Sequence, residues 1–273
     1  MNITDTLLSN LKWISEKYNI SLNGVLHLGA HLGQEAAIYS SLDFDVVWVE
    51  GHPEIFKQLQ RNLLPYYPRQ IAIQALISDT DNNTASLYVT NNNSESSSVL
   101  APDENIFSRE WKGIEVVNKI ELKTKRIDTL LKENKIDSSK YNILIIDLQG
   151  YELTAMKGMG EILDNIEIIS TEVNLGHIYK GADLLHNIDG FLLNRGFTRV
   201  WLSMSGVQGE AWYVRRDTGS LKKLFIISGD YISEYLYRSG ILRLLKKNHY
   251  AFSILRRLYY KIHRRQTSVD EKR

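Results

Sequence analysis

The chain has no cysteine and only four prolines among its 273 residues. Without cysteine, disulfide bonds, thiolate zinc sites and cysteine nucleophiles are excluded. No segment approaches the run of about 18 apolar residues that a transmembrane helix needs, so none is expected. The amino terminus, MNITDTLLSNLKWISEKY, has neither a basic segment nor a continuous apolar run and does not resemble a signal peptide. Together with 43% hydrophobic residues, these features predict a folded cytoplasmic protein with a sizeable core.

Charge is unevenly distributed along the chain. The net charge is +1, but residues 235–269 contain nine Lys or Arg and no acid, which leaves 24 basic and 32 acidic residues elsewhere. We therefore expect one domain over residues 1–216 and a basic amphipathic helical extension over 217–273. The basic stretch at 235–265 can lie as a peripheral contact on an anionic membrane, or its helices can pack on the domain with a solvated basic face. No nucleic-acid partner is predicted, because no reading motif accompanies the basic residues. The oligomeric state is left open.

Apolar runs alternate with helix-like segments along most of the chain. The runs that predict strands are 24–28, 45–50, 71–77, 142–147, 166–174, 197–203 and 210–215, with further candidates at 85–90 and 116–122. The segments that predict helices are 4–18, 33–42, 53–64, 128–134, 152–164 and 183–194. Alternation of strands with helices indicates an α/β fold with a doubly wound, mostly parallel, Rossmann-like sheet.

The most informative stretch is ILIIDLQGYELTAMKG at residues 143–158. Its unbroken apolar run is typical of a strand buried on both faces, and the run ends at Asp147. Open α/β sheets bind ligands in the crevice beyond the carboxyl ends of such strands. Asp147 and Glu152 are therefore candidates for the chemistry, although Glu152, in the first turn of a helix, can simply complement the helix dipole.

A second informative stretch lies upstream, where residues 24–35 read GVLHLGAHLGQE. A strand runs into Gly29 and Gly33, and the next strand ends at Glu50. Glycines after the first strand let a ligand approach the backbone, and an acid at the end of the second strand, 21 residues after Gly29, suits a ribose diol. The full GxGxxG fingerprint is not present. The strand–turn–helix–strand context nevertheless indicates an adenosine-containing ligand.

These motifs together resemble the FkbM-type S-adenosylmethionine-dependent methyltransferases. The resemblance covers roughly residues 20–216 and rests on GVLHLGAHLGQ, VVWVEGHPEIFKQLQRNL, SESSSVL (94–100), RIDTLL (126–131), IDLQGYELTAMKG (146–158) and STEVNLGHIYKG (170–181). It implies the methyltransferase strand order, with the last strand antiparallel. It also implies transfer of a methyl group from S-adenosylmethionine to an acceptor, most often a hydroxyl of a sugar, glycan or specialised metabolite. Many members carry an acid where this chain has His27.

The resemblance and the strand positions together assign candidate cofactor contacts. Glu50 is expected to accept hydrogen bonds from both ribose hydroxyls, and Asp79, just beyond the third strand, either reaches the adenine or forms a turn. Asp147 either holds the sulfonium-bearing ligand or acts on the acceptor. The full set of expected cofactor-binding residues is His27, Gly29, Ala30, His31, Gly33, Glu50, Ser78, Asp79 and Asp147.

Candidate catalytic and acceptor residues follow the fourth and fifth strands of the expected sheet. An alcohol must lose its proton during or after attack, so a base is needed. The candidates for catalysis are Asp147, Glu172 and His177, and those for acceptor binding are Gln149, Glu152, Asn174, Tyr179 and Lys180. A metal is not predicted; the alternative set of oxygen ligands for a divalent cation such as Mg²⁺ is Asp147, Glu172 and Asn174. The polar stretch 91–98 is either a surface loop or a lid.

Two other functions stay open at this point. A nicotinamide-dependent oxidoreductase would need a fuller glycine-rich turn than the chain has. The other alternative is a non-catalytic cofactor-binding scaffold or degenerate methyltransferase that serves as a partner. Intact Gly29, Gly33, Glu50 and Asp147 argue against degeneracy.

Overall fold

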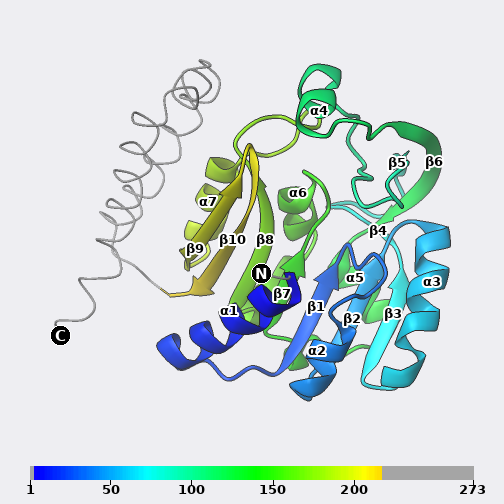
Figure 1. The fold of residues 1–273 in the computed structure, drawn as a ribbon. Helices are drawn as coiled ribbons and strands as arrows, with labels where there is room; N and C mark the ends of the chain where they lie inside the picture. Colours follow the sequence, from blue (N-terminus) through cyan, green and yellow to red (C-terminus); the bar gives the residue numbers. More distant parts are fainter. Residues whose placement is uncertain (1–2, 217–273) are drawn as a thin grey trace, which may run out of the picture.

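A seven-stranded sheet with the order β3-β2-β1-β7-β8-β10-β9 lies at the centre of the computed structural model (Figure 1). Its strands are β1 (Gly24–Leu28), β2 (Asp45–Glu50), β3 (Gln70–Gln74), β7 (Ile143–Ile146), β8 (Ile168–Asn174), β9 (Phe197–Ser205) and β10 (Gln208–Arg215). The structure describes residues 3–216, with side chains from residue 6 onward. The extension expected at 217–273, with its membrane contact at 235–265, lies outside the described residues.

Strand direction identifies the type of sheet. Neighbouring strands from β3 to β8 run parallel, whereas β10 is antiparallel to both β8 and β9. This confirms the doubly wound, mostly parallel sheet with its last strand antiparallel. The sheet differs from the dinucleotide-binding one, whose six strands follow the order 3-2-1-4-5-6, because β10 is inserted between β8 and β9.

Helices cover both faces of the sheet (Figure 1). They are α1 (Ile3–Tyr18), α2 (Ala36–Ser41), α3 (Pro53–Leu63), α5 (Ile127–Glu133), α6 (Glu152–Lys157) and α7 (Leu185–Leu193), with short 3₁₀ turns η1 (Leu64–Tyr66), η2 (Ser138–Lys140) and η3 (Gly160–Asn165). Helix α4 (Glu104–Glu110) lies beyond the carboxyl-terminal edge of the sheet. Successive strand residues point to opposite faces: Val25 packs in a cluster with Leu11 of α1, and Leu26 packs in another with Ile188 of α7. Burial of each such side chain stabilises the fold by roughly 1.5–3 kcal/mol.

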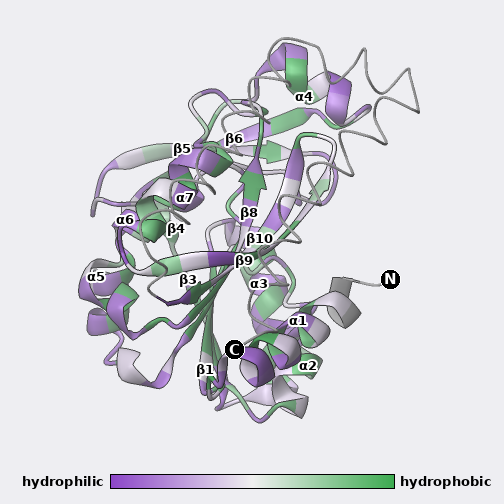
Figure 2. Ribbon diagram, turned by 90° about the vertical axis from the view of Figure 1, so that its left-hand side faces the viewer, coloured by the Kyte–Doolittle hydropathy of each residue, from purple (hydrophilic) through white to green (hydrophobic). Residues whose placement is uncertain are grey.

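The burial of the strands between two layers of helices is visible in the hydropathy of the chain. Figure 2 shows hydrophobic (green) residues along strands such as β1 and β8, and mixed colours on the helices. Continuous apolar strands are expected where both faces are covered. Among residues 3–216, no helix is long and apolar enough to cross a membrane.

Helix α3 begins where it does because His52 caps it. The His52 ring nitrogen Nδ1 accepts hydrogen bonds from the backbone N–H groups of Glu54 (3.2 Å) and Ile55 (3.4 Å), and Pro53 occupies the first helical position. The cap holds the end of β2 against the start of α3. The position of Glu50 is thereby set by local structure.

The run expected as one strand at 71–77 forms two, which corrects that prediction. A separate three-stranded sheet consists of β4 (Leu76–Ile77), β5 (Thr84–Thr90) and β6 (Val116–Lys125). The chain changes partner at Ala75, whose N–H still donates to the carbonyl of Glu50 (3.1 Å). Both halves are apolar, so hydrophobic pattern alone does not reveal the change.

The helix expected over 152–164 is also interrupted. Helix α6 ends at Lys157, and the 3₁₀ turn η3 follows it. At Gly158 an added Cβ would lie 2.2 Å from the carbonyl oxygen of Ser78, so the chain approaches the turn after β4 too closely for a side chain. Helix α4, capped by the side chain of Asp103, has no counterpart among the expected elements.

Candidate active site

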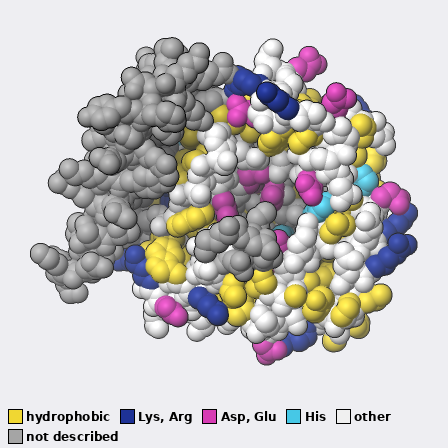
Figure 3. Space-filling model, in the orientation of Figure 1, with side chains coloured by type: hydrophobic (Ala, Val, Ile, Leu, Met, Phe, Trp, Pro, Cys, Tyr) yellow, Lys and Arg dark blue, Asp and Glu magenta, His cyan; other side chains and the backbone are white. Residues whose placement is uncertain are grey.

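A cavity of about 1200 Å³ opens at the carboxyl ends of β1, β2 and β7. Figure 3 shows acidic side chains gathered around a hollow in this face of the molecule. Its wall includes residues 29–31, 50–52 and 147–149, together with Glu172 on β8 and Glu210 on β10. No Lys or Arg of the described chain lines it. The cavity thus occupies the crevice in which open α/β sheets bind ligands, and its wall is acidic.

Glu50 organises one end of the cavity. Its carboxylate oxygens accept hydrogen bonds from two backbone N–H groups, Oε2 from His31 (2.9 Å) and Oε1 from His52 (2.7 Å). Burial raises the pKa of Glu50, although these two hydrogen bonds oppose the rise. A carboxylate oxygen has more than one acceptor site, so Glu50 can still accept from a ligand.

Gly29 and Gly33 both have positive φ, +80° and +72°, but for different reasons. A Cβ at Gly29 would lie 1.8 Å from the carbonyl oxygen of Asp147, so glycine is required for β1 and β7 to end side by side. A Cβ at Gly33 would meet Leu59 of α3 at 2.8 Å. Gly29 lines the cavity and Gly33 does not.

His27 forms part of the cavity wall as a neutral aromatic ring. It is 6% exposed and stacks on Trp48, with 4.6 Å between ring centroids. Its Nδ1 lies 3.2 Å from the hydroxyl of Tyr39, and burial lowers its pKa to about 3. Histidine in this position therefore offers no charge to a ligand at neutral pH.

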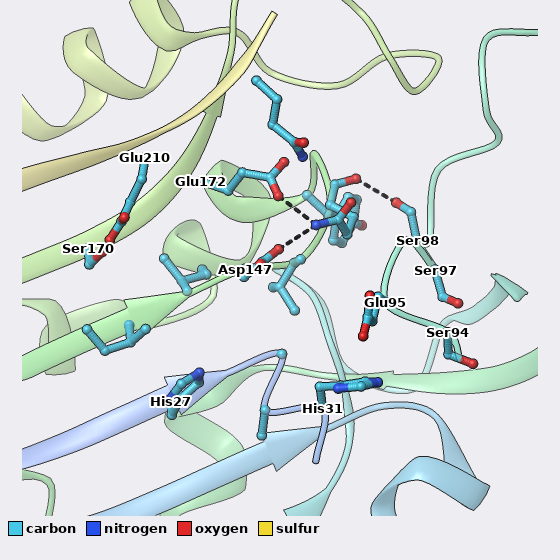
Figure 4. Close-up of a pocket in the computed structure, with 18 of the residues that line it drawn as sticks. His27, His31, Ser94, Glu95, Ser97, Ser98, Asp147, Ser170, Glu172 and Glu210 are labelled. Atoms are coloured by element: carbon cyan, nitrogen blue, oxygen red, sulfur yellow. Dashed lines mark hydrogen bonds between the residues drawn. The ribbon is translucent and has the colours of Figure 1, made fainter. Parts of the chain in front are cut away.

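Asp147 and Glu172 face each other at the other end of the cavity (Figure 4). The side-chain amide of Gln149 lies between them, and its Nε2 donates to Asp147 Oδ1 (2.7 Å) and to Glu172 Oε2 (2.6 Å). Asp147 is exposed to the cavity, whereas Gln149 is buried. Burial, and then the charges of Asp147 and Glu152, raise the pKa of Glu172 well above its ordinary value.

Glu152 lies beneath this pair. Its Oε1 accepts hydrogen bonds from the backbone N–H groups of Leu148 (2.9 Å) and Gly150 (3.0 Å), and it closes the turn that carries Asp147. Carboxylate oxygens of Asp147, Glu152 and Glu172 all lie within 4.8 Å of one another. Burial and the charge of Asp147 raise the pKa of Glu152 to about 7.

The carboxylates that lie close enough to share a divalent cation differ from the expected set. The alternative set from the sequence contained Asn174, but Glu152 takes its place in the group of nearby carboxylates. The amide of Gln149 already bridges the oxygens of Asp147 and Glu172, which is the position that a cation shared by these two would need. Hydrogen bonds from Gln149 therefore connect two of the three carboxylates.

The polar stretch 91–98 forms a wall of the cavity. Ser94, Glu95, Ser97 and Ser98 line it (Figure 4). His31 Nε2 lies 2.9 Å from the carbonyl oxygen of Asn93, which ties the stretch to the turn after β1. Of the two interpretations of the sequence, a segment that covers the site fits this placement.

Comparison with known proteins identifies the family. The profile of the methyltransferase FkbM domain matches residues 27–199. The chain belongs to the FkbM methyltransferase family. A search of curated proteins finds no match.

Solved structures with similar folds include two methyltransferases. The magnesium protoporphyrin IX methyltransferase of Synechocystis PCC 6803, with bound S-adenosylmethionine, is 10% identical over 78% of this chain and 79% of that chain, with a TM-score of 0.43. A candidate caffeoyl-CoA O-methyltransferase from Staphylococcus aureus is 14% identical over 77% of this chain and 83% of that chain, with a TM-score of 0.43.

Membership of the FkbM family confirms the resemblance and S-adenosylmethionine as the cofactor. It also argues against the alternative function as a nicotinamide-dependent oxidoreductase. The residues present fit this cofactor, because Glu50 ends β2 with free acceptor capacity and the acidic wall suits a ligand that carries positive charge.

Several expected site residues of this FkbM protein do not line the cavity. These are Gly33, Ser78, Asp79, Glu152, Asn174, His177, Tyr179 and Lys180. Ser78 Oγ lies 3.1 Å from the hydroxyl of Tyr151, His177 Nδ1 lies 2.9 Å from the carbonyl oxygen of Ala182, and Lys180 is exposed. The expected residues that do line it are His27, Gly29, Ala30, His31, Glu50, Asp147, Gln149 and Glu172.

Sequence reasoning missed Glu210, which lines the cavity from β10. It lies directly opposite Glu172 in the antiparallel pair of β8 and β10, and its Oε1 accepts from Ser170 Oγ (2.6 Å) and from Trp212 Nε1 (2.8 Å). Like charges directly opposite each other are normally unfavourable. Only the register between β8 and β10, two strands that are distant in sequence, places Glu210 at the site. The hydrophobic pattern of the sequence does not reveal that register.

Proposed function

We propose that this FkbM protein transfers a methyl group from S-adenosylmethionine to a hydroxyl of a sugar, glycan or specialised metabolite. The observation that carries the proposal is the pair of carboxylates, Asp147 and Glu172, at the cavity end away from Glu50. An acceptor between the two ends would meet the donor on one side and a proton acceptor on the other.

The donor end is the part built by β1 and β2. The carboxylate of Glu50 would accept hydrogen bonds from the ribose hydroxyls, and residues 29–31 would border the amino acid part. S-adenosylmethionine supplies an electrophilic methyl group on a positively charged sulfur. The protein supplies binding and alignment, and alignment of two reactants can be worth roughly 7–11 kcal/mol.

The acceptor end supplies a base. An alcohol has a pKa far above neutrality, so its proton must leave as the new bond forms, and a well-placed base contributes about 10²–10⁴-fold. Asp147 is exposed to the cavity, and the raised pKa of Glu172 makes that side chain a better proton acceptor than an ordinary carboxylate. His177, the other expected candidate, is held at the carbonyl of Ala182 and lies outside the cavity wall.

The charge of the wall supports an uncharged acceptor. Glu95, Glu172 and Glu210 line the cavity, and no Lys or Arg of the described chain does. Phosphate groups are bound chiefly by Arg, Lys and backbone N–H groups. A neutral alcohol therefore fits better than a phosphorylated acceptor or a nucleic acid.

Methyl transfer from isotope-labelled S-adenosylmethionine to matched sugars tests this proposal. Neutral methyl glycosides should be methylated at least about tenfold faster than their 6-phosphates, since repulsion of about 1.4 kcal/mol already gives that factor. Asp147→Asn should keep donor binding and lose transfer, and Asp164→Asn, an exposed change elsewhere, should lose neither. Preference for the phosphates, or full activity of Asp147→Asn, would contradict the proposal, and donor binding without transfer to any alcohol would favour a scaffold.

We further propose that residues 235–265 bring the enzyme to the cytoplasmic face of an anionic membrane, where glycan precursors are accessible. The nine basic residues between 235 and 269 support this, since each adds about 1 kcal/mol of attraction near such a surface. Sedimentation of the full chain with phosphatidylserine vesicles should exceed that of a chain ending at Arg216. Equal sedimentation of the two would remove the proposal.

A further inference from the structure

Gln149 was expected to bind the acceptor, but its side-chain amide has no donor left for one. Its two N–H groups are directed to two different carboxylates, at 2.7 Å to Asp147 and 2.6 Å to Glu172. Its amide oxygen Oε1 lies 2.9 Å from the hydroxyl of Tyr179. The residue is 8% exposed, so most of its surface is out of contact with solvent.

The hydroxyl of Tyr179 lies on the oxygen side of the Gln149 amide, opposite the two carboxylates. The hydroxyl carries a single proton, which is shared between Gln149 Oε1 and the carbonyl oxygen of Ser96, and the nitrogen of the amide faces the two carboxylates. Tyr179 is 1% exposed, and burial followed by the charge of Glu172 raises its pKa far above the ordinary value, so it stays a donor. The same hydroxyl lies 2.7 Å from the carbonyl oxygen of Ser96. The acceptor end is thereby connected to the 91–98 segment.

The backbone of Gln149 is held in an unfavourable conformation. Its φ is +55°, in the left-handed region that favours glycine. The hydroxyl of Ser98 donates to its carbonyl oxygen (2.8 Å), and Glu152 accepts from the N–H groups on either side of it. A glycine would fit this turn without strain, so the chain retains a side chain here at a cost. Such strain points to a role for that side chain.

We propose that Gln149 is a positioning residue, which holds Asp147 and Glu172 at a fixed separation and is itself oriented by the two carboxylates and Tyr179. Two carboxylates this close would otherwise repel each other, and one would take up a proton. A neutral amide that donates to both stabilises the ionised forms without supplying a charge. This inference deepens the proposed function, on which it rests for the task of the pair.

The titration of Glu172 tests the role of Gln149 directly. The full-length protein, labelled with ¹³C at glutamate and aspartate carboxyl carbons and saturated with S-adenosylhomocysteine, would be titrated by NMR. In Gln149→Met, which has similar length and no donor, the midpoint of Glu172 should rise by about one pH unit or more. Loss of one hydrogen bond to a charged group corresponds to roughly that shift. Tyr179→Phe should shift the midpoint in the same direction by a smaller amount, because the amide loses its orientation.

Gln60→Met, at an exposed position of α3, is the matched control and should leave the midpoint unchanged. A folded Gln149→Met protein with the wild-type midpoint would overturn the positioning role, and so would a lowered midpoint. Affinity for S-adenosylhomocysteine, measured by calorimetry on the same samples, should stay within about threefold of wild type, since Gln149 lies at the acceptor end. Absence of S-adenosylhomocysteine binding by the wild-type protein would instead undermine the proposed function. Failure of the positioning role and failure of the proposed function are therefore distinguishable.

Discussion

At the scale of single residues, Gly29 sets the distance between β1 and β7. In Gly29→Ala the new Cβ would meet the carbonyl oxygen of Asp147, and alanine would be forced to φ +80°. We expect a loss of about 3 kcal/mol or more of unfolding free energy, from strain and overpacking together. Gly190→Ala is the control, because nothing lies within 4 Å of its Cβ position in α7, and it should gain up to about 1 kcal/mol. Urea denaturation of both variants measures this, and an unchanged midpoint for Gly29→Ala would contradict the contact.

Glu152 should make stability depend on pH near neutrality. Its pKa is about 7 in the folded protein against an ordinary 4.5, so the folded state binds the extra proton. The contribution of this proton to the unfolding free energy is complete below pH 4.5. It is lost as the pH rises through 7, and the loss amounts to as much as about 3 kcal/mol.

Glu152→Gln tests this contribution, since its amide oxygen can still accept from Leu148 and Gly150. The decline in unfolding free energy between pH 4.5 and 7.5 should become smaller in this variant than in wild type. Glu161→Gln, at an exposed position of η3, should keep the wild-type decline. Parallel pH profiles for wild type and Glu152→Gln would show that the side chain is not the source.

The residues placed best by sequence are those at strand ends. Glu50 and Asp147 each follow an apolar run, and the end of a buried strand is readable from such a pattern. Tyr179 and Glu210 were misjudged or missed for a different reason. Tyr179 follows β8 in sequence, but its hydroxyl is used by Gln149 and Ser96, and only the packed structure reveals those partners.

At the scale of elements, the 91–98 segment depends on a few contacts with the domain. His31→Asn keeps a residue that tolerates the φ of +46° but cannot reach the carbonyl oxygen of Asn93. We expect amide hydrogen exchange in residues 91–98 to accelerate by about fivefold, as loss of one net hydrogen bond of about 1 kcal/mol implies. Exchange in α7 should not change. Unaltered exchange across 91–98 would mean that His31 does not hold the segment.

The main elements were predictable because the apolar runs that predict strands alternate with segments whose apolar residues have helical spacing. β1 and β2 have the expected bounds, and α3 starts at the Pro that marks it. The exceptions are tertiary in origin. β3 and β4 separate at Ala75 because two different sheets compete for one apolar run, and α6 stops where Gly158 meets Ser78.

At the scale of the whole molecule, charge is separated between the cavity and the carboxyl-terminal extension. Among residues 3–216 the cavity wall contains carboxylates without Lys or Arg, whereas nine basic residues fall between 235 and 269. The acidic wall suits the positively charged donor, whereas the proposed neutral acceptor and anionic membrane surface await the tests described above. The acidic wall also explains why the net charge of +1 is a poor guide to the site.

Calorimetric titration of the full-length protein with S-adenosylmethionine, and separately with NAD, tests the central claim most directly. We predict saturable binding of S-adenosylmethionine and none of NAD. Glu50→Ala should weaken that binding by about tenfold to a hundredfold, because hydrogen bonds to a charged group are lost, whereas Glu161→Ala should not. Circular dichroism would confirm that both variants are folded. Absence of S-adenosylmethionine binding by the folded protein, or full affinity of Glu50→Ala, would contradict the account.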